Sequence, residues 1–218
     1  MSIRIGTKFY TLFNELSETD HDLPYKPARK RKAEDVDKIV VHWTGGRPDR
    51  KIKDFVGILG KSPVKGLGYH FVIDANAIVW QLADPATDVC SHAGGSIGGR
   101  SINQRSIGVA FMGAGTDARF WGNGVPVRDP VHNGLVKYLP PTDKQLQALC
   151  ALLETLTEQM GIARNVNTEV ITKMKPAELD LVGIVGHYQV SDHKTDPGPF
   201  TLKAIEDYFN GLAAGYAE

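Results

Sequence analysis

A short polar stretch near the C-terminal end, residues 186–199, concentrates side chains that could hold a metal ion. Within GHYQVSDHKTDPGP stand two histidines, a lysine and two aspartates. The closing Pro-Gly-Pro restricts the backbone to one non-helical path, as in a loop that keeps its side chains in place. An imidazole such as that of His187 and a carboxylate such as that of Asp196 are typical zinc ligands.

A second stretch of the same form lies far upstream, at residues 38–46 (KIVVHWTGG): a short apolar run, then His42, then a glycine pair. The apolar run at 182–185 before His187 also predicts a buried strand. Both histidines should therefore emerge where strands end, at the edge where open α/β sheets place their sites. If the two strands are neighbours, His42, His187 and Asp196 supply the three protein ligands of a catalytic zinc ion and leave the fourth position for water.

The bulk composition is that of a soluble globular protein. Of 218 residues, 42% are hydrophobic and 23% are charged, enough for one well-buried core. Lys+Arg and Asp+Glu are both 25, so no global field attracts nucleic acid. Residues 1–8 carry no secretory signal and no run reaches the length of a membrane span, so we expect a protein made in the cytoplasm, without membrane partners. We also expect a monomer without nucleic-acid partners. Cys90 and Cys150 lie far apart, unlike a zinc knuckle, and are expected to be reduced thiols.

Residues 1–36 are the least informative part of the chain. The basic cluster at residues 29–32 (RKRK) could bind nucleic acid, a polymerase or an anionic lipid. Acidic residues follow at once, at positions 34, 35 and 37, which favours a solvated linker. We therefore expect an N-terminal extension of unknown role, with a regulatory protein as one conceivable partner.

Periodic patterns predict the elements that must position these residues. Thr142, with Gln145 three residues later, opens the clearest helix, in which leucines recur at helical spacing until about Gly161. Other patterns predict a strand at 106–112, a hairpin over 69–82 and helices at 54–59 and about 201–212. Two long irregular stretches, at 84–103 and 113–141, are expected to be loops.

Five motifs occur in order: HWTGG from residue 42, GYHFVID from 68, SHAGGS from 91, RSIGVAFMG from 105 and GHYQVSDHKTDPGP from 186. Together they resemble the zinc-dependent N-acetylmuramoyl-L-alanine amidases, which include phage lysozymes of the amidase type and the peptidoglycan-recognition proteins. The resemblance implies an α/β fold: a single domain with a central mixed β-sheet flanked by helices and an active-site groove at the strand C-terminal edge. It places the amidase domain at residues 37–213, between the extension at 1–36 and a tail at 214–218.

The resemblance also implies an activity and its residues. Such an enzyme cleaves the amide bond between N-acetylmuramic acid and L-alanine of bacterial peptidoglycan with zinc-activated water, using one Zn²⁺ per chain held by His42, His187 and Asp196. Tyr69 and Lys194 match catalytic positions of the family. Tyr69 would handle the proton, and Lys194 would stabilise the oxyanion that forms. The alternatives are an aromatic core residue and one more surface lysine.

Ala110 departs from one branch of the family, because the muropeptide-recycling enzymes carry a glutamate at this position of their strand. With Tyr69 and Lys194, this places the chain nearer the phage lysozymes. The resemblance then suggests a bacteriolytic phage endolysin, stored in the host cytoplasm and acting on the cell wall after holin-type release. Two alternatives remain: a non-catalytic peptidoglycan-recognition module and a cytosolic muropeptide-recycling amidase.

Three further residues match family positions at the substrate groove: His92, Arg100 and Asn103. Each could contact the substrate, and Arg100 is suited to a carboxylate of the peptide stem. Hydrogen bonds that brace the loop explain the three equally well. His70 alternates to the side opposite Tyr69 and is expected in the core or behind the metal ligands.

Overall fold

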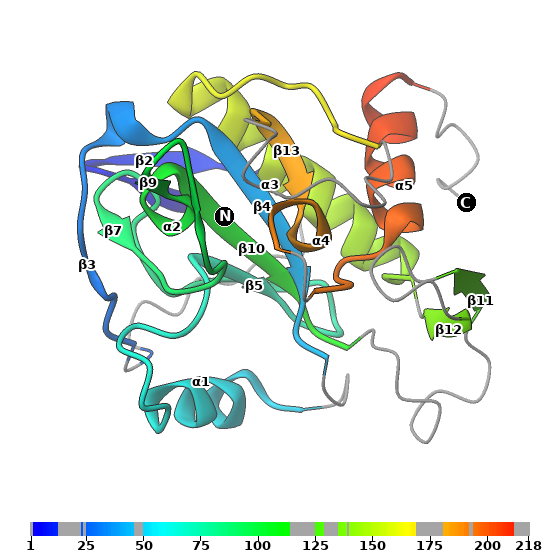
Figure 1. Ribbon diagram of the computed structural model, residues 1–218, viewed down its shortest axis with the longest axis horizontal. Coiled ribbons are helices and arrows are strands. Elements are labelled where there is room, and N and C mark those ends of the chain that lie inside the picture. The colour runs from blue at the N-terminus through cyan, green and yellow to red at the C-terminus, as the bar shows by residue number, and fades with distance from the viewer. Residues whose placement is uncertain are drawn as a thin grey trace.

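The computed structural model describes residues 2–12, 23, 25–45, 50–113, 125–128, 135–138, 140–168, 181–191 and 194–211. At its centre is a five-stranded sheet of order β13-β4-β10-β5-β6 (Figure 1). Its strands are β13 (Gly183–Gly186), β4 (Lys38–Trp43), β10 (Ser106–Phe111), β5 (Phe71–Ile73) and β6 (Val79–Gln81). Only β6 runs antiparallel to its neighbour. The predicted mixed sheet is confirmed, and the two strands that lead to the histidines are neighbours.

Both faces of the sheet are covered, since every residue of β4 and of β10 is buried. Side chains alternate between the faces: Ile39 and Val41 join the core cluster that includes helix α3, whereas Val40 packs in a separate cluster. His42, two residues after Val40, therefore lies on the second face. In the parallel register of the two strands, Ala110 is paired with His42.

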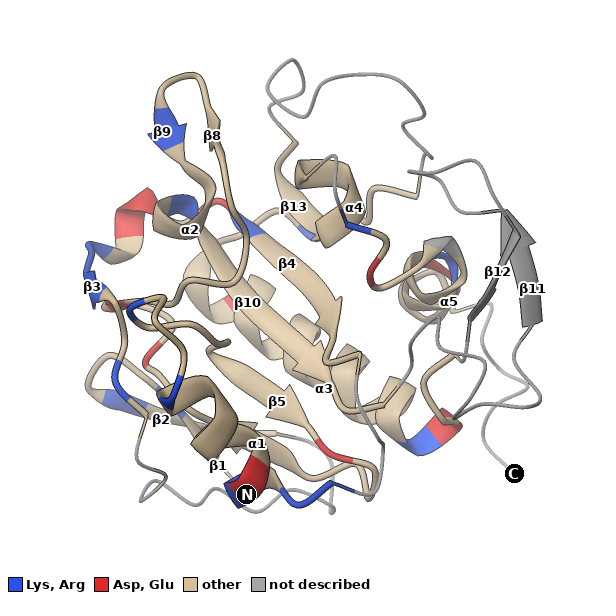
Figure 2. Cartoon of the chain, turned by 60° about the horizontal axis from the view of Figure 1, so that its bottom comes forward, with Lys and Arg blue, Asp and Glu red and all other residues tan. Residues whose placement is uncertain are grey.

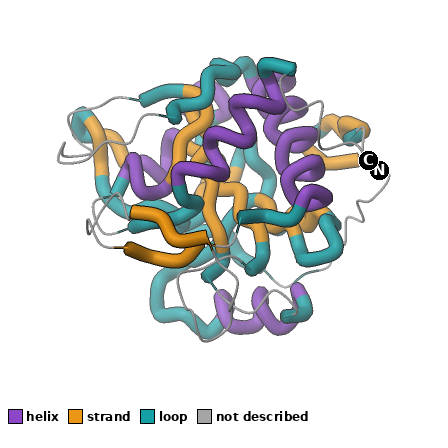
Figure 3. The backbone as a smooth tube through the Cα atoms, turned by 90° about the vertical axis from the view of Figure 1, so that its right-hand side faces the viewer, coloured by secondary structure: helices purple, strands orange, loops and turns teal. Residues whose placement is uncertain are grey.

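Helices α3 (Asp143–Met160) and α5 (Pro199–Phe209) lie side by side on the first face (Figures 1 and 3). A capping box begins α3: Gln145 N donates to Thr142 Oγ1 at 3.3 Å, and Thr142 N donates to Gln145 Oε1 at 3.1 Å. The helix ends at Gly161, which adopts the left-handed conformation with φ 65°. The helix predicted from this pattern is confirmed. None of the helices in the described part of the chain is long and apolar enough to cross a membrane.

The second face is covered by shorter elements: α1 (Ile52–Gly60), α2 (Ile102–Arg105), α4 (His187–Val190) and the loops between them. In Figure 2, α1 lies in front of the sheet and α3 behind it. The stretch expected to be a loop at 84–103 contains three short strands: β7 (Asp88–Val89), β8 (Ser96–Ile97) and β9 (Arg100–Ser101). Of the irregular stretch at 113–141, the structure describes the paired strands β11 (Val125–Arg128) and β12 (Leu135–Tyr138), while the tail at 214–218 lies outside the described residues.

The described N-terminal residues pack onto the domain. Strands β1 (Ser2–Ile5) and β2 (Lys8–Thr11) form a hairpin whose buried residues Ile3 and Ile5 belong to the same core cluster as α3. The amide of Arg4 donates to Gln81 Oε1 at 2.8 Å, and Gln81 Nε2 donates to the Arg4 carbonyl at 2.6 Å, which ties the hairpin to β6. Further on, β3 (Arg29–Lys30) pairs with β7 and precedes a short 3₁₀ helix, η1 (Ala33–Asp35).

Arg31 is buried, so the interpretation of residues 29–32 as a solvated linker is wrong for this residue. Its guanidinium donates to the carbonyl oxygens of Ser106 at 2.5 Å and Pro85 at 2.6 Å, and it lies 3.2 Å from Nε2 of His70. A charge run marks residues that prefer water, but a guanidinium can be buried where backbone carbonyls accept its protons.

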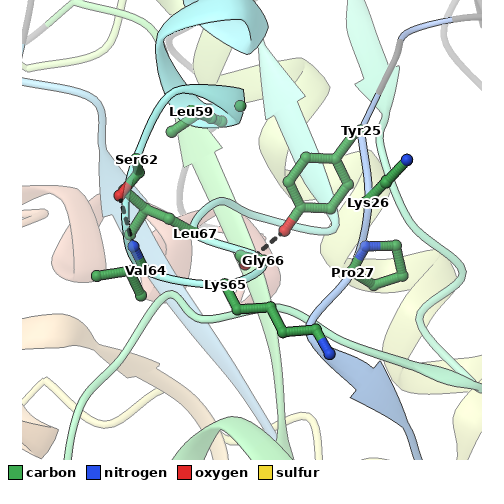
Figure 4. Close-up of a pocket in the computed structure, with 10 residues that line it drawn as sticks. Tyr25, Lys26, Pro27, Leu59, Ser62, Val64, Lys65, Gly66 and Leu67 are labelled. Atoms are coloured by element: carbon green, nitrogen blue, oxygen red, sulfur yellow. Dashed lines mark hydrogen bonds between the residues drawn. The ribbon is translucent and has the colours of Figure 1, made fainter.

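A cavity of about 400 Å³ lies between the end of α1, the loop at 62–67 and the segment at 25–27 (Figure 4). The Tyr25 hydroxyl donates to the Gly66 carbonyl at 2.7 Å. Gly66 has φ +63°, and a Cβ there would lie 2.2 Å from the Ala28 nitrogen, so only glycine allows this approach. The N-terminal segment thereby holds the loop that leads into Tyr69.

Candidate metal centre

Three buried side chains meet where β4 and β13 end: His42, His187 and Asp196. Nδ1 of His42 lies 2.9 Å from Oδ2 of Asp196, and Nδ1 of His187 lies 3.1 Å from the same oxygen. One ligand atom from each of the three residues lies within 4.8 Å of the others, so that the group could hold a metal ion. The structure thus brings together the three residues that the sequence predicts as ligands.

Local backbone contacts hold the three residues in place. Gly186, the last residue of β13, is in register with Val41 of β4, so His187 follows directly beside His42. The Tyr188 amide donates to the Asp196 carbonyl at 3.0 Å, which brings the Asp196 segment back to the start of α4. A Cβ on Gly186 would lie 2.7 Å from the Tyr188 ring and 2.9 Å from Pro197 Cδ, so the close return depends on glycine.

The two separations between histidine and aspartate ligand atoms lie near those of a zinc site. Tetrahedral zinc with bonds of about 2.0–2.2 Å keeps its ligand atoms roughly 3.3–3.6 Å apart. The observed 2.9 and 3.1 Å lie a few tenths of an ångström below this. Two imidazoles and one carboxylate form a donor set that zinc accepts, and three protein ligands leave a position for water.

The electrostatics of the cluster favour the protonation states that a metal needs. Burial and the neighbouring His187 lower the pKa of His42 to about 4, although Asp196 opposes the shift. Burial by itself would raise the pKa of Asp196, but the neighbouring imidazoles of His187 and His42 outweigh it and hold that pKa well below its usual range. At neutral pH the imidazole of His42 is therefore neutral and Asp196 is ionised, as metal ligands must be.

Tyr69 lies beside the cluster. Its half-buried ring is 4.9 Å from the ring of His42, centroid to centroid, and stacks on Phe55 at 6.4 Å. Burial raises the pKa of the Tyr69 phenol, and the Asp196 carboxylate adds to the shift. The hydroxyl therefore keeps its proton at neutral pH and can donate a hydrogen bond.

Lys194 is exposed, two residues before Asp196. Its ammonium lies close enough to His42 to be one of the charges that lower the pKa of that imidazole, after burial and His187. The lysine thus contributes a positive charge at the solvent side of the cluster, where the sequence predicts an oxyanion-stabilising cation.

The three predicted substrate-binding residues lie in different surroundings. His92 is buried, with Nδ1 3.0 Å from Nε2 of His42 and Nε2 3.1 Å from the Ser106 hydroxyl. Oδ1 of Asn103 accepts from the amides of His92 at 3.1 Å and Ala93 at 2.8 Å, so Asn103 braces the loop. Arg100 is exposed in the small β8-β9 sheet, and of the three it is the one open to a ligand.

His70 lies in the core, as expected, with both ring nitrogens engaged away from the metal cluster. Its Nδ1 accepts from the Gly108 amide at 3.0 Å, and its Nε2 donates to the Asp88 carbonyl at 3.0 Å. Sequence reasoning missed two residues of this region, Ser106 and Gly108. Part of the signal was present, because Ser106, Gly108 and Ala110 are two residues apart and therefore share the strand face that adjoins His42.

A mixed sheet that carries a buried His-His-Asp group at the ends of two parallel strands defines an α/β protein with a candidate catalytic metal centre. The chain belongs to the N-acetylmuramoyl-L-alanine amidase family, whose model matches residues 32–199. No protein of curated function matches the chain significantly.

Solved structures share the fold at low sequence identity. N-acetylmuramoyl-L-alanine amidase LysC from Clostridium intestinale is 20% identical with a TM-score of 0.55, over 85% of this chain and 93% of that chain. The endolysine amidase LysCS from the same organism is 19% identical with a TM-score of 0.55, over 88% and 99%. The complex of peptidoglycan recognition proteins LCa and LCx with tracheal cytotoxin is 16% identical with a TM-score of 0.54, over 87% and 94%.

Proposed function

We propose that this chain is a zinc-dependent amidase that hydrolyses the bond between N-acetylmuramic acid and the L-alanine of the peptide stem. The observation that carries the proposal is the complete ligand set, with His42, His187 and Asp196 buried and converging on one point. A module that only recognises peptidoglycan would not need all three ligands together, and membership of the amidase family supports the same activity.

The residues around the cluster have separate roles in this reaction. A bound zinc ion would polarise the scissile carbonyl and lower the pKa of its water to about 7. Tyr69, protonated and beside His42, would donate a hydrogen bond to the reacting oxygen atoms. Lys194, on the exposed side, would place its positive charge near the carbonyl oxygen as negative charge develops there.

The biological role that we propose is that of a bacteriolytic endolysin, released onto the cell wall from within. Ala110, buried and in register with His42, provides no carboxylate of the kind expected in muropeptide-recycling enzymes. Tyr69 and Lys194 are the residues that the phage branch carries instead. The fold shared with the endolysine amidase LysCS is consistent with this role.

The test uses purified cell walls and the zinc-loaded protein, with the His187→Ala variant as control. We expect new free L-alanine amino termini without new reducing sugar ends, and none of these termini with the variant. A parallel assay on soluble muropeptides separates the two cellular roles, because an endolysin should favour the polymer and a recycling enzyme the fragments.

Two results would contradict the proposal. New reducing ends would mean that the enzyme is a glycosidase. Binding to walls without release of L-alanine termini, by a protein that contains no zinc, would instead support the recognition module.

A further inference from the structure

In the chain of hydrogen bonds behind His42, the donor and the acceptor of each bond can be assigned. It ends at the carbonyl of Ile102, which can only accept and which receives the Ser106 hydroxyl proton at 2.6 Å. A hydroxyl has one proton, so Ser106 Oγ has only lone pairs left for its second contact, with Nε2 of His92 at 3.1 Å. His92 must therefore carry a proton on Nε2 and donate it.

The same assignment of donors and acceptors extends through His92 to His42. The described residues place no carboxylate against the His92 ring, and a buried cation without a partner is costly, so His92 is neutral and has a single N–H. With that proton on Nε2, its Nδ1 must accept, and the donor 3.0 Å away is Nε2 of His42. His42 then has a bare Nδ1, which faces Asp196 at 2.9 Å.

We propose that His92, held by Ser106, is a positioning residue that keeps His42 in the tautomer with a bare Nδ1 directed at the metal. The inference deepens the proposed function and rests on it only for the identity of the metal site. It also explains why the cluster needs a cation, because the bare Nδ1 of His42 and the carboxylate of Asp196 are both acceptors. Two acceptors this close repel each other unless a cation lies between them.

The sheet is built to receive the His92 ring. A Cβ on Gly108 would lie 2.6 Å from Cγ of His92, so the ring occupies the space that a side chain in β10 would otherwise fill. The side chain of Asn103 holds the backbone of His92, because its Oδ1 accepts a hydrogen bond from the His92 amide. The imidazole is thus fixed at its backbone, at one face and at both nitrogens, as a group that orients a metal ligand should be.

The test compares His92→Leu, which has no hydrogen-bonding groups, with His92→Gln, whose amide can both accept from His42 and donate to Ser106. Zinc affinity is measured by competition with a chromophoric chelator, and the free energy of unfolding is measured for each metal-free protein. We expect a 10- to 100-fold loss of affinity, the usual effect of removing such a partner, in His92→Leu. His92→Gln should restore most of the affinity, and Gly108→Ala should resemble His92→Leu because it displaces the ring.

The decisive readout is the tautomer itself, from ¹⁵N imidazole NMR of the metal-free wild-type protein. A proton on Nε2 of His42 supports the proposal, and a proton on Nδ1 overturns it. Equal zinc affinity in His92→Leu and wild type, or no zinc binding by wild type, also overturns it. Because the NMR readout needs no turnover, a protein with the expected tautomer and zinc affinity but no amidase activity would contradict the proposed function alone.

Discussion

The rings of Tyr69 and His42 lie against each other, with 4.9 Å between their centroids and 52° between their planes. On its other side Tyr69 stacks on Phe55 in a nearly parallel arrangement, with 8° between the planes. Both contacts are made by the ring and neither by the hydroxyl. One substitution can therefore separate the packing role of Tyr69 from its proposed chemistry.

Tyr69→Phe keeps these ring contacts and removes only the hydroxyl. We expect kcat on cell walls to fall about 10²- to 10⁴-fold, the range for loss of a group that handles a proton. Zinc content and the midpoint of thermal unfolding should stay at the wild-type values. If the variant keeps the wild-type rate, Tyr69 is an aromatic packing residue, which is the alternative that its sequence context leaves open.

Asp196→Asn separates metal binding from folding. The variant should lose zinc and activity, because a neutral amide is a poor ligand. Its metal-free form should be at least as stable as metal-free wild type, since the amide can donate a hydrogen bond to Nδ1 of His42 or His187. In thermal unfolding, zinc at 100 times its Kd should stabilise wild type by about 2.7 kcal/mol and leave the variant unchanged. Equal stabilisation of both proteins would remove Asp196 from the ligand set.

Local patterns in the sequence predicted the elements well where short-range chemistry decides the structure. Thr142 and Gln145 begin a helix through contacts within one turn, and the apolar runs before His42 and His187 become buried strands. Because parallel strands end at one edge, these runs also indicated where the metal ligands would meet.

The sequence could not indicate contacts that depend on the tertiary structure. His92 resembles a residue of a substrate loop, but its contact with His42 joins residues 50 positions apart and exists only after β4 and the loop pack together. In the sequence, Arg31 belongs to a basic cluster that is typical of a solvated linker. Its acceptors are carbonyls more than 50 residues further along the chain, which no local pattern reveals.

Arg31 is therefore expected to matter for stability. Arg31→Ala leaves the carbonyls of Ser106 and Pro85 buried without a donor and should lower the free energy of unfolding by about 3 kcal/mol or more. Arg29→Ala, an exposed neighbour in the same basic cluster, should change it by less than about 0.5 kcal/mol. Urea titration of both variants measures the difference.

The same pair of variants tests the basic cluster as a binding arm. Deletion of residues 1–32 would remove Tyr25 and Arg31 together with the basic cluster. A loss of function in that protein would therefore not distinguish a binding arm from a structural support. If Arg29→Ala abolishes binding to a partner while stability is unchanged, the cluster is an interaction site. Equal stability of Arg31→Ala and wild type would contradict the structural role of Arg31.

The two cysteines give a prediction for pH dependence. Cys90 and Cys150 are fully buried, and burial, the main cause, raises the pKa of each thiol to about 12, well above the roughly 8.5 of an unfolded chain. The folded protein therefore holds these protons when the unfolded chain has released them, so its stability should fall as the pH rises from about 9 towards 12. Each thiol contributes a slope of up to about 1.4 kcal/mol per pH unit.

Urea titrations at pH 8 and pH 10 measure this effect, and Cys150→Ala should remove about half of the thiol contribution. At pH 8 both thiols should be inert to a disulfide reagent in the native protein and react only after unfolding, because the thiolate is the reactive form. Rapid modification of the native protein at pH 8 would show that at least one thiol is accessible, which contradicts its complete burial in the core.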